Sequence, residues 1–319
     1  MKNILITGGA GFIGYALYLK LKLNKRNKIF ILDLANKIKE KKFDKKCTIL
    51  KLDISKKKGF DAIKSIKFET VYHLAAETST YLCEINPEKC FKSNILGTFN
   101  LYDYCKKTQP RNIIFASSMA VYGEKAANVS ENKICEPISF YGISKLIGEK
   151  IISKLDDTIT NIKIFRLFNV YGPNQDFENK YQGMFSIYLS QIIKKKKISI
   201  TGRLSRCRDF IYIDDVIRCL TNSKIIENKT FKILNLGTGV KTNIKKLILQ
   251  LFKALKTKVS IQILKGHKGD TFISYANISK LRKLKWECKT RLKKGINKTI
   301  KNILYYYGNR SITDWKSRI

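Results

Sequence analysis

The chain has 319 residues, 44% of them hydrophobic, which is enough for one large or two moderate folded domains. It carries 63 basic and 25 acidic residues, for a formal net charge of +38. Only 11 of the basic residues are arginine, and the lysines are scattered without a concentrated stripe, so the charge favours small anionic ligands over nucleic acid.

The N-terminal segment predicts a strand, a helix and a second strand. Residues 4–6 are a short apolar run, residues 15–23 carry apolar residues at helical spacing, and residues 29–32 form another apolar run. This order is typical of a βαβ unit, in which two parallel strands are joined by a crossover helix.

Glycines fill the turn between the first strand and the helix. They match the spacing G-x-x-G-x-x-G at Gly8, Gly11 and Gly14. Such a turn lets the backbone approach a pyrophosphate, whose charge lies against the helix N-terminus. Asp33 ends the second strand, 19 residues after Gly14, where a carboxylate can accept hydrogen bonds from an adenosine ribose. The unit therefore predicts dinucleotide binding, with NAD favoured over NADP because a 2′-phosphate would be repelled.

The strand-to-loop pattern recurs along the chain. Apolar runs that end in small or polar residues lie at 47–55, 70–79, 112–123 and 162–172. This alternation predicts an α/β fold with a parallel sheet, whose carboxyl edge carries the ligands.

The eight cysteines include no C-x-x-C pair and there are only two histidines, so the sequence predicts no metal site and reduced thiols. No apolar run has the length of a membrane span. The N-terminus enters an apparent strand at once, which leaves no room for a signal peptide. We expect a cytoplasmic protein without membrane or nucleic-acid partners.

A tyrosine followed four residues later by a lysine occurs three times, at Tyr18/Lys22, Tyr102/Lys106 and Tyr141/Lys145. On a helix this spacing puts both side chains on one face, where the ammonium can make the phenol a usable base. A lysine-rich chain produces the pattern by chance, so the spacing alone does not identify a catalytic pair.

A longer set of motifs resembles one family. In order, the motifs are the glycine turn, HLAA at 73–76, SSMAVYG at 117–123, YGISK at 141–145, FNVYG at 168–172, RDFIYIDDV at 208–216, NLGTG at 235–239 and GDTFISYANISK at 269–280. Together they resemble the extended short-chain dehydrogenase/reductases, specifically the NAD-dependent nucleotide-sugar epimerase/dehydratase group that includes UDP-glucose 4-epimerase.

The resemblance implies two domains. The first is a Rossmann domain, a doubly wound parallel sheet that binds NAD, over residues 1–168 and 210–238. The second is a smaller C-terminal α/β domain that binds the nucleotide sugar, over residues 169–209 and 239–319.

The resemblance also selects Tyr141/Lys145 as the catalytic pair, because only this pair follows a strand-end serine at the family's interval, with Ser118 lying 23 residues upstream. Tyr141 would take a proton from a sugar hydroxyl, and Ser118 would bind the same oxygen. Lys145 and the positive nicotinamide ring are expected to draw the pKa of Tyr141 down from about 10. Lys145 would also hold the nicotinamide ribose.

The remaining site residues carry over by position. Those expected to contact NAD, besides Tyr141 and Lys145, are Gly8, Gly11, Phe12, Ile13, Gly14, Asp33, Asp53, Ile54, Ala75, Ala76, Asn94 and Phe168. The alternative for Ile54, Ala75 and Phe168 is ordinary core packing. Those expected to contact the nucleotide sugar, besides Ser118, are Asn169, Arg208, His267, Asp270 and Ser274. His267 stands where relatives often carry arginine. His73 reads as a structural residue at a strand end.

The residues after Ser118 separate the possible reactions. Dehydratases and decarboxylases of this group usually carry an acid there, whereas this chain has Met119 and Ala120, which transfer no proton. The resemblance therefore implies reversible oxidation at C4 of a nucleotide sugar, a 4-epimerisation with tightly held NAD. A dehydratase, a nucleotide-sugar reductase and a non-catalytic dinucleotide sensor stay as alternatives.

Two finer expectations follow from the same resemblance. Ser274 aligns with a pocket position that is tyrosine in hexose-restricted epimerases, so a small residue there admits the acetamido group of UDP-GlcNAc and UDP-GalNAc beside UDP-glucose and UDP-galactose. A serine that merely starts a strand is the alternative. The chain is also expected to form a homodimer through helices at 90–107 and 144–155, with Ile95, Phe99, Leu101 and Tyr102 as an apolar face or, alternatively, as core.

Overall fold

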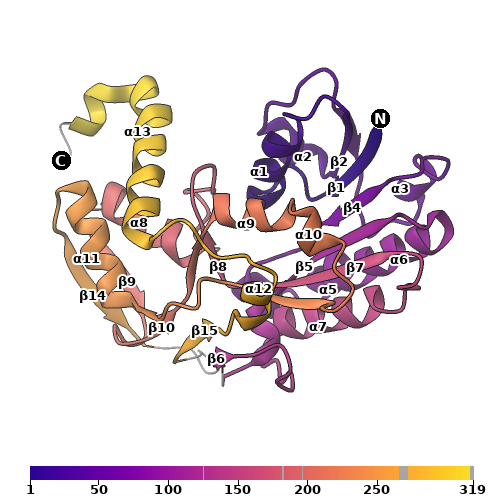
Figure 1. The fold of residues 1–319 in the computed structure, drawn as a ribbon. Helices are drawn as coiled ribbons and strands as arrows, with labels where there is room; N and C mark the ends of the chain where they lie inside the picture. The colour runs from indigo at the N-terminus through magenta and orange to yellow at the C-terminus, as the bar shows by residue number, and fades with distance from the viewer. Residues whose placement is uncertain (125, 182, 196, 266–271, 317–319) are drawn as a thin grey trace.

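The computed structural model describes residues 1–319 except 125, 182, 196, 266–271 and 317–319. A parallel seven-stranded sheet forms its larger part, and α-helices cover both faces (Figure 1). The strands, in spatial order, are β12 (Ile233–Leu236), β7 (Asn161–Leu167), β5 (Asn112–Ser118), β4 (Thr70–His73), β1 (Lys2–Thr7), β2 (Asn27–Asp33) and β3 (Thr48–Lys51). The predicted α/β class and parallel sheet are confirmed.

The alternation of side chains along β1 explains the two layers. Ile4 and Ile6 point into a core with α1 (Phe12–Leu21) and α9 (Ile213–Leu220), whereas Leu5 points into a second core with α6 (Gly97–Thr108) and α7 (Phe140–Ile152). Successive side chains of a strand face opposite sides, so one apolar strand anchors both layers. Leu101 lies in the second core, fully buried. The expectation that it belongs to an exposed apolar face is wrong, and its core alternative holds.

The strand order reverses between β1 and β4. Chain connections leave these strands in opposite directions, so their carboxyl ends open a crevice between the loops that follow them. Thr7 pairs with His73 in the register, which brings the glycine turn after β1 beside residues 74–76. Ligands of doubly wound sheets bind at this position.

A second group of elements lies beyond the carboxyl edge (Figure 1). Its sheets are small: β8 pairs with β11, β9 with β14, β10 with β13, and β15 with β6. The bounds are β6 (Ala126–Val129), β8 (Asn169–Tyr171), α8 (Met184–Lys195), β9 (Lys197–Thr201), β10 (Cys207–Arg208), β11 (Phe210–Tyr212), β13 (Thr242–Asn243), α11 (Ile244–Leu255), β14 (Ser260–Leu264), β15 (Ser274–Ala276), α12 (Ser279–Lys283) and α13 (Leu292–Lys316).

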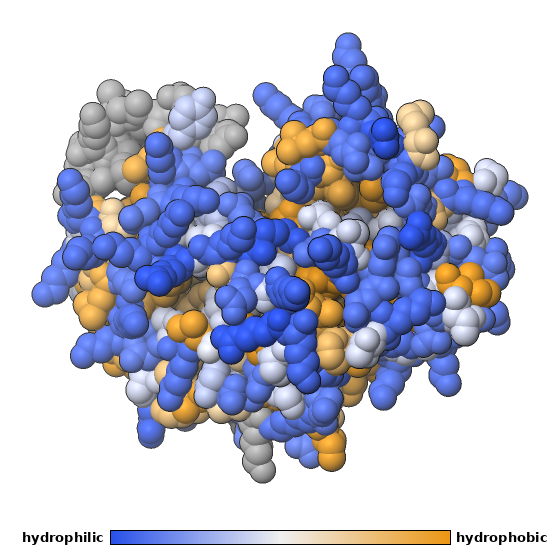
Figure 2. All heavy atoms as spheres, viewed as in Figure 1, coloured by the Kyte–Doolittle hydropathy of each residue, from blue (hydrophilic) through white to orange (hydrophobic). Residues whose placement is uncertain are grey.

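Short helices complete the chain. They are α2 (Ala35–Lys39), α3 (Lys58–Asp61), α4 (Thr80–Ile85), α5 (Pro87–Phe91), a π-turn (Lys92–Leu96), a 3₁₀ turn (Met119–Tyr122) and α10 (Ser223–Ile226). In Figure 2 hydrophilic side chains are spread widely over the face in view, with smaller hydrophobic patches between them, as the scattered lysines predict. Among the helices of the described residues, none combines the length and apolarity needed to cross a bilayer.

Candidate active site

The glycine turn is packed too closely for any side chain. Gly8 has φ +71°, and a Cβ there would lie 2.6 Å from the Ala75 nitrogen. A Cβ on Gly14 would lie 2.1 Å from the Gly8 oxygen. Gly11 caps α1 without a side-chain hydrogen bond, so backbone N–H groups form the start of the helix. This cradle fits a pyrophosphate, with Phe12 and Ile13 opening the helix beneath it.

Asp33 is fixed beside this turn. Its Oδ2 accepts the Ala10 N–H at 2.8 Å and its Oδ1 accepts the Leu34 N–H at 2.8 Å. Burial raises the pKa of the carboxyl, while the two N–H donors lower it. Each carboxylate oxygen can accept a second hydrogen bond, so the group still has capacity for ribose hydroxyls.

The other expected NAD contacts lie along the same edge in mixed environments. Asp53 Oδ1 accepts the Ser55 N–H at 2.9 Å, and Ile54 packs in the core under α6. Ala75 and Ala76 follow β4 and are half-buried, whereas Phe168 is buried after β7. Ile54 and Phe168 are core residues and Ala75 packs against the second core, so the core alternative describes all three, and their contact with NAD stays a prediction.

Asn94 lies in the π-turn and is buried. Its side chain accepts the Glu77 N–H at 2.7 Å and donates to the Glu77 carbonyl at 2.9 Å. It also donates to Ser144 Oγ at 2.9 Å. Asn94 therefore ties the loop after β4 to the helix that carries Tyr141.

Ser118, Tyr141 and Lys145 come together at the carboxyl end of β5. Ser118 Oγ accepts the Ala120 N–H at 3.2 Å and lies near enough to the Tyr141 hydroxyl to lower its pKa. The Lys145 Nζ donates to the Ala116 carbonyl at 2.9 Å and lies 6.0 Å from the centre of the Tyr141 ring. Ser139 caps α7 by accepting the Gly142 N–H, which sets where the helix begins and how Tyr141 projects.

Burial dominates the titration of this group. It raises the pKa of Tyr141 to about 12, against the lowering effect of the Ser118 hydrogen bond. Burial also lowers the pKa of Lys145 to about 8, although the Glu149 carboxylate raises it. Protein groups alone therefore do not produce the expected low pKa of Tyr141, because desolvation of the phenolate outweighs them.

The other two Tyr-x-x-x-Lys pairs differ. Tyr18 is buried in the core of the sheet, with its hydroxyl accepting the Asp44 N–H at 2.8 Å. Tyr102 lies half-buried on α6, beside the exposed Phe99. Neither has a serine partner at a strand end in its hydrogen bonds within the described part of the chain.

His73 has a structural role. It ends β4, is buried, and its ring nitrogens hydrogen-bond Thr7 Oγ1 at 2.8 Å and Thr98 Oγ1 at 2.9 Å. Burial lowers its pKa to about 3, with the Lys145 charge adding to the effect. The ring is neutral and links β1 to α6.

Two of the expected sugar contacts, Asn169 on β8 and Arg208 on β10, lie in the second group of elements. Asn169 donates from Nδ2 to the Asp209 carbonyl at 3.2 Å, and Arg208 is buried with its Nη1 donating to the Cys207 carbonyl at 2.8 Å. Burial lowers the pKa of Arg208 to about 10, and the Arg206 charge adds to this. His267 and Asp270 lie outside the described residues.

Ser274 starts β15 and is fully buried. Its Oγ donates to Met119 Sδ at 2.7 Å, so it lies against the residue that follows Ser118.

Three acids near the site were not predicted from the sequence: Asp209 and Glu149 are buried, and Glu77 is half-buried. Asp209 accepts backbone N–H groups from residues 238, 239 and 276, so it joins the β12 loop to β15. Glu149 forms a buried pair with Arg166, one turn after Lys145. Glu77 raises the pKa of Tyr141. Asp209 lies inside the RDF motif and could have been found there, but the partners of the other two are set by the fold.

One thiol expectation is wrong. Cys83 and Cys90 form a disulfide, whereas the free cysteines are Cys47, Cys105, Cys135, Cys207, Cys219 and Cys288. The two half-cystines lie on separate short helices, and a spacing of seven residues gives no signal for this in the sequence.

Comparison with known proteins agrees with this geometry. The family model described as "NAD dependent epimerase/dehydratase family" matches residues 4–237. The chain is 33% identical to a putative UDP-glucose 4-epimerase of Methanocaldococcus jannaschii, over 93% of this chain and 97% of the relative. It is 30% identical to a UDP-glucuronate 4-epimerase of Thermodesulfobacterium geofontis, over 94% of this chain and 95% of the relative.

Solved structures give the same result. The UDP-glucose 4-epimerase of Thermotoga maritima with UDP-glucose superimposes with a TM-score of 0.87 at 28% identity, covering 96% of this chain and 99% of that one. The UDP-glucose 4-epimerase of Thermus thermophilus with NAD gives 0.84 at 26% identity, covering 94% and 98%. This chain belongs to the NAD-dependent epimerase/dehydratase family, its fold is that of the UDP-sugar 4-epimerases, and its cofactor is NAD.

Proposed function

We propose that the protein interconverts C4 epimers of a UDP-sugar through a 4-keto intermediate. The observation that carries the proposal is the cluster of Ser118, Tyr141 and Lys145 at the edge of the sheet where the glycine turn lies. The glycine turn and Asp33 would hold NAD, which when bound would supply reversible hydride transfer at C4 of the sugar. Tyr141 takes the C4 hydroxyl proton, and Ser118 holds the same oxygen.

Lys145 acts on Tyr141 by charge. The pKa of Tyr141, raised to about 12 by burial, must fall before the phenol can serve as a base near neutral pH. An ammonium at Lys145 and the positive ring of oxidised nicotinamide both favour phenolate. Because the pKa of Lys145 is about 8, this support is lost as the pH rises through that value.

The 3₁₀ turn after Ser118 supports epimerisation over elimination. Met119 and Ala120 have no group that transfers a proton, and a dehydratase or decarboxylase needs one near the sugar. The same side chains offer no hydrogen-bond donor to the carboxylate of a sugar acid. Plain UDP-hexoses are therefore favoured over UDP-glucuronate, the sugar named for the 30%-identical relative.

Arg208 and Asn169 are the proposed contacts to the diphosphate. A buried guanidinium whose pKa is depressed gains from a nearby anion, and its planar donors match phosphate oxygens. His267 and Asp270 are also proposed to bind the nucleotide sugar. Ser274, beside Met119, is proposed to leave room for an acetamido group, so that UDP-GlcNAc and UDP-GalNAc are also substrates.

The proposal includes a division of labour along the chain. Residues 1–168 and 210–238 would hold NAD, and residues 169–209 and 239–319 would hold the sugar. Support comes from β12, which pairs in parallel with β7 although the chain between them enters the smaller sheets. A homodimer is proposed through α6 and α7, where Phe99 is 50% and Ile147 is 36% exposed.

The experiment is incubation of purified protein with UDP-galactose and no added cofactor, followed by chromatography of the nucleotide sugars. We expect UDP-glucose to appear with no net change in reduced nicotinamide absorbance, because the hydride is returned. Tyr141→Phe should abolish turnover, while Tyr102→Phe, the same change in a non-catalytic Tyr-x-x-x-Lys pair, should retain it. Accumulation of reduced cofactor or of a 4-keto-6-deoxy sugar would refute the proposal.

Sugar preference is tested by kcat/KM for plain, acetylated and uronate UDP-sugars. In Ser274→Tyr, turnover of acetylated sugars should fall at least tenfold relative to plain ones, provided that a thermal melt shows the variant folded. Equal losses for both substrates would refute the assignment of Ser274. A preference for UDP-glucuronate in the wild type would refute the choice of plain hexoses.

A further inference from the structure

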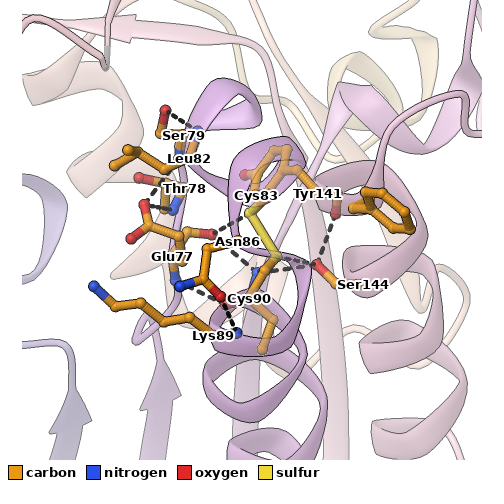
Figure 3. The surroundings of a disulfide bond; sticks show 12 residues. Glu77, Thr78, Ser79, Leu82, Cys83, Asn86, Lys89, Cys90, Tyr141 and Ser144 are labelled. Carbon is orange, nitrogen blue, oxygen red and sulfur yellow. Dashed lines mark hydrogen bonds between the residues drawn. A yellow bond between two sulfur atoms is a disulfide. The ribbon is translucent and has the colours of Figure 1, made fainter.

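The disulfide between Cys83 and Cys90 joins two short helices at the base of the active site (Figure 3). Cys83 lies on α4 and Cys90 on α5. The helical conformation is interrupted at Asn86, and α5 begins at Pro87. Both cysteines are fully buried, and their Cα atoms are 5.1 Å apart. The bond therefore determines how α4 packs against α5.

Cys90 touches the polar network that holds the catalytic helix. Its Sγ lies 3.5 Å from Asn94 Nδ2 and 3.8 Å from Ser144 Oγ. Asn94 donates to Ser144 at 2.9 Å, and Ser144 donates to the Tyr141 carbonyl at 2.8 Å. In Figure 3 dashed lines run from Cys90 to Ser144 and from Ser144 to Tyr141. Only one hydrogen-bonded residue stands between the sulfur and the backbone of the proposed base.

The same network reaches the loop after β4. Asn94 binds both backbone groups of Glu77, and Glu77 Oε1 accepts the N–H groups of Thr78 and Ser79 just before α4. Asn94 is also a proposed NAD contact. The sulfur of Cys90 thus lies where the loop after β4, helix α7 and helix α4 meet.

Oxidised and reduced cysteines cannot occupy this space identically. Bonded sulfurs lie about 2.05 Å apart, whereas two thiols in van der Waals contact need about 3.5–4 Å. Buried interiors are close-packed, so a separation of more than an ångström must displace neighbours. Cys90 is confined by Asn94 and Ser144, while α4 has a solvent-exposed side that includes Tyr81 and Ile85. Reduction should therefore loosen α4 together with the loop and Asn94.

We propose that Cys83 and Cys90 form a reversible dithiol–disulfide site that sets NAD retention and the position of Tyr141. In oxidation, the thiolate of one cysteine attacks a low-molecular-weight disulfide such as oxidised glutathione, forms a mixed disulfide and releases one thiolate. The thiolate of the other cysteine then attacks that bond, closes the Cys83–Cys90 disulfide and releases the second. Two electrons pass from the cysteine sulfurs to the small disulfide, and a dithiol reverses the reaction. Both sulfurs become accessible when α4, six residues long, opens at the surface.

The experiment equilibrates the purified holoenzyme in glutathione buffers from oxidising to reducing. Free thiols are alkylated and the peptide that contains residues 83–90 is quantified by mass spectrometry. In parallel samples, NAD retained after desalting, the melting temperature and kcat are measured. We expect the disulfide in the oxidised sample, and on reduction at least a threefold loss of retained NAD, a lower melting temperature and a three- to tenfold lower kcat. Reoxidation should restore all three.

Variants separate this site from the other cysteines. Cys83→Ala and Cys90→Ala should each resemble the reduced enzyme in every buffer, whereas Cys105→Ala, a change at another buried cysteine, should keep the redox response. Full alkylation of Cys83 and Cys90 in the wild type at every buffer would overturn the proposal. Equal NAD retention and melting temperature in the oxidised and reduced forms would overturn it too, whichever sugar proves to be the substrate.

Discussion

Replacing Glu149 by glutamine should reveal how strongly α7 is anchored to the sheet. Arg166 donates from Nε to Oε1 at 2.9 Å and from Nη2 to Oε2 at 2.8 Å, and the two side chains are only 4% and 3% exposed. Ser117 donates to the same carboxylate. A glutamine turns one acceptor into a donor that faces the guanidinium, and it leaves the Arg166 charge buried without a counter-ion.

Breaking one side of such a buried pair costs about 3–5 kcal/mol. The Arg166 contacts with the Glu131 carbonyl and the Tyr122 ring remain, so we expect a loss of about 3 kcal/mol. With an unfolding entropy of about 2.1 cal/mol/K per residue, a 319-residue chain should melt roughly 4–5 °C lower.

Thermal and urea unfolding, followed by circular dichroism, measure this loss. The control is Asp103→Asn, which breaks the exposed Lys107–Asp103 pair and should cost under ~0.5 kcal/mol. The double variant Glu149→Leu/Arg166→Met removes both charges and should lose less than Glu149→Gln alone. This account of the pair would be refuted if Glu149→Gln lowered the free energy of unfolding by less than about 1 kcal/mol, or if the double variant were less stable than the single one.

The same substitution should shift the pH dependence of activity. Because the Glu149 carboxylate raises the pKa of Lys145, its loss should move that pKa below about 8 and shift the alkaline fall in kcat to lower pH. An unchanged alkaline limb would mean that Lys145 does not control it.

Three further results are expected. The pKa of His73 is about 3 in the folded chain and 6.5 in the unfolded chain, so between these values the unfolded chain binds one more proton. The free energy of unfolding should therefore fall as the pH drops, by at most about 1.4 kcal/mol per pH unit. Urea titrations of His73→Gln should show a weaker dependence of this free energy on pH, and an equal slope would contradict the prediction. Gly14→Ala puts a Cβ 2.1 Å from the Gly8 oxygen and should weaken NAD binding at least tenfold by fluorescence titration, whereas Gly59→Ala, with its nearest contact at 3.4 Å, should bind normally. Phe99→Glu should convert a dimer to a monomer in light scattering, and a wild-type monomer would dismiss the dimer.

The sequence predicted the sheet well because its signals are local. Each core strand is a short apolar run, and the glycine turn and Asp33 lie within one βαβ unit. The catalytic choice of Tyr141 needed longer-range information, namely the distance to Ser118 and the order of motifs. The placement of these residues agrees with that choice, although their catalytic role stays a proposal.

Other features could not be predicted because their partners meet only in the folded chain. Glu149 lies on α7 and Arg166 on β7, and the two side chains meet only when α7 packs against the sheet. Ser274 reaches Met119 across 155 residues. Cys83 and Cys90 are close in sequence, but only the break between α4 and α5 turns them toward each other. The raised pKa of Tyr141 reflects burial, which no motif reports.

The crossing of the chain between β7 and β12 also affects synthesis on the ribosome. The edge of β7 that pairs with β12 stays unpaired after Leu167 emerges, until Ile233 is synthesised about 65 residues later. At about 5–20 residues per second this takes ~3–13 s. During that interval a strand that the finished fold buries from Ile162 to Arg166 presents open backbone groups. A nascent chain stalled before residue 233 is therefore a natural client for chaperones, and a chain truncated at that point should aggregate.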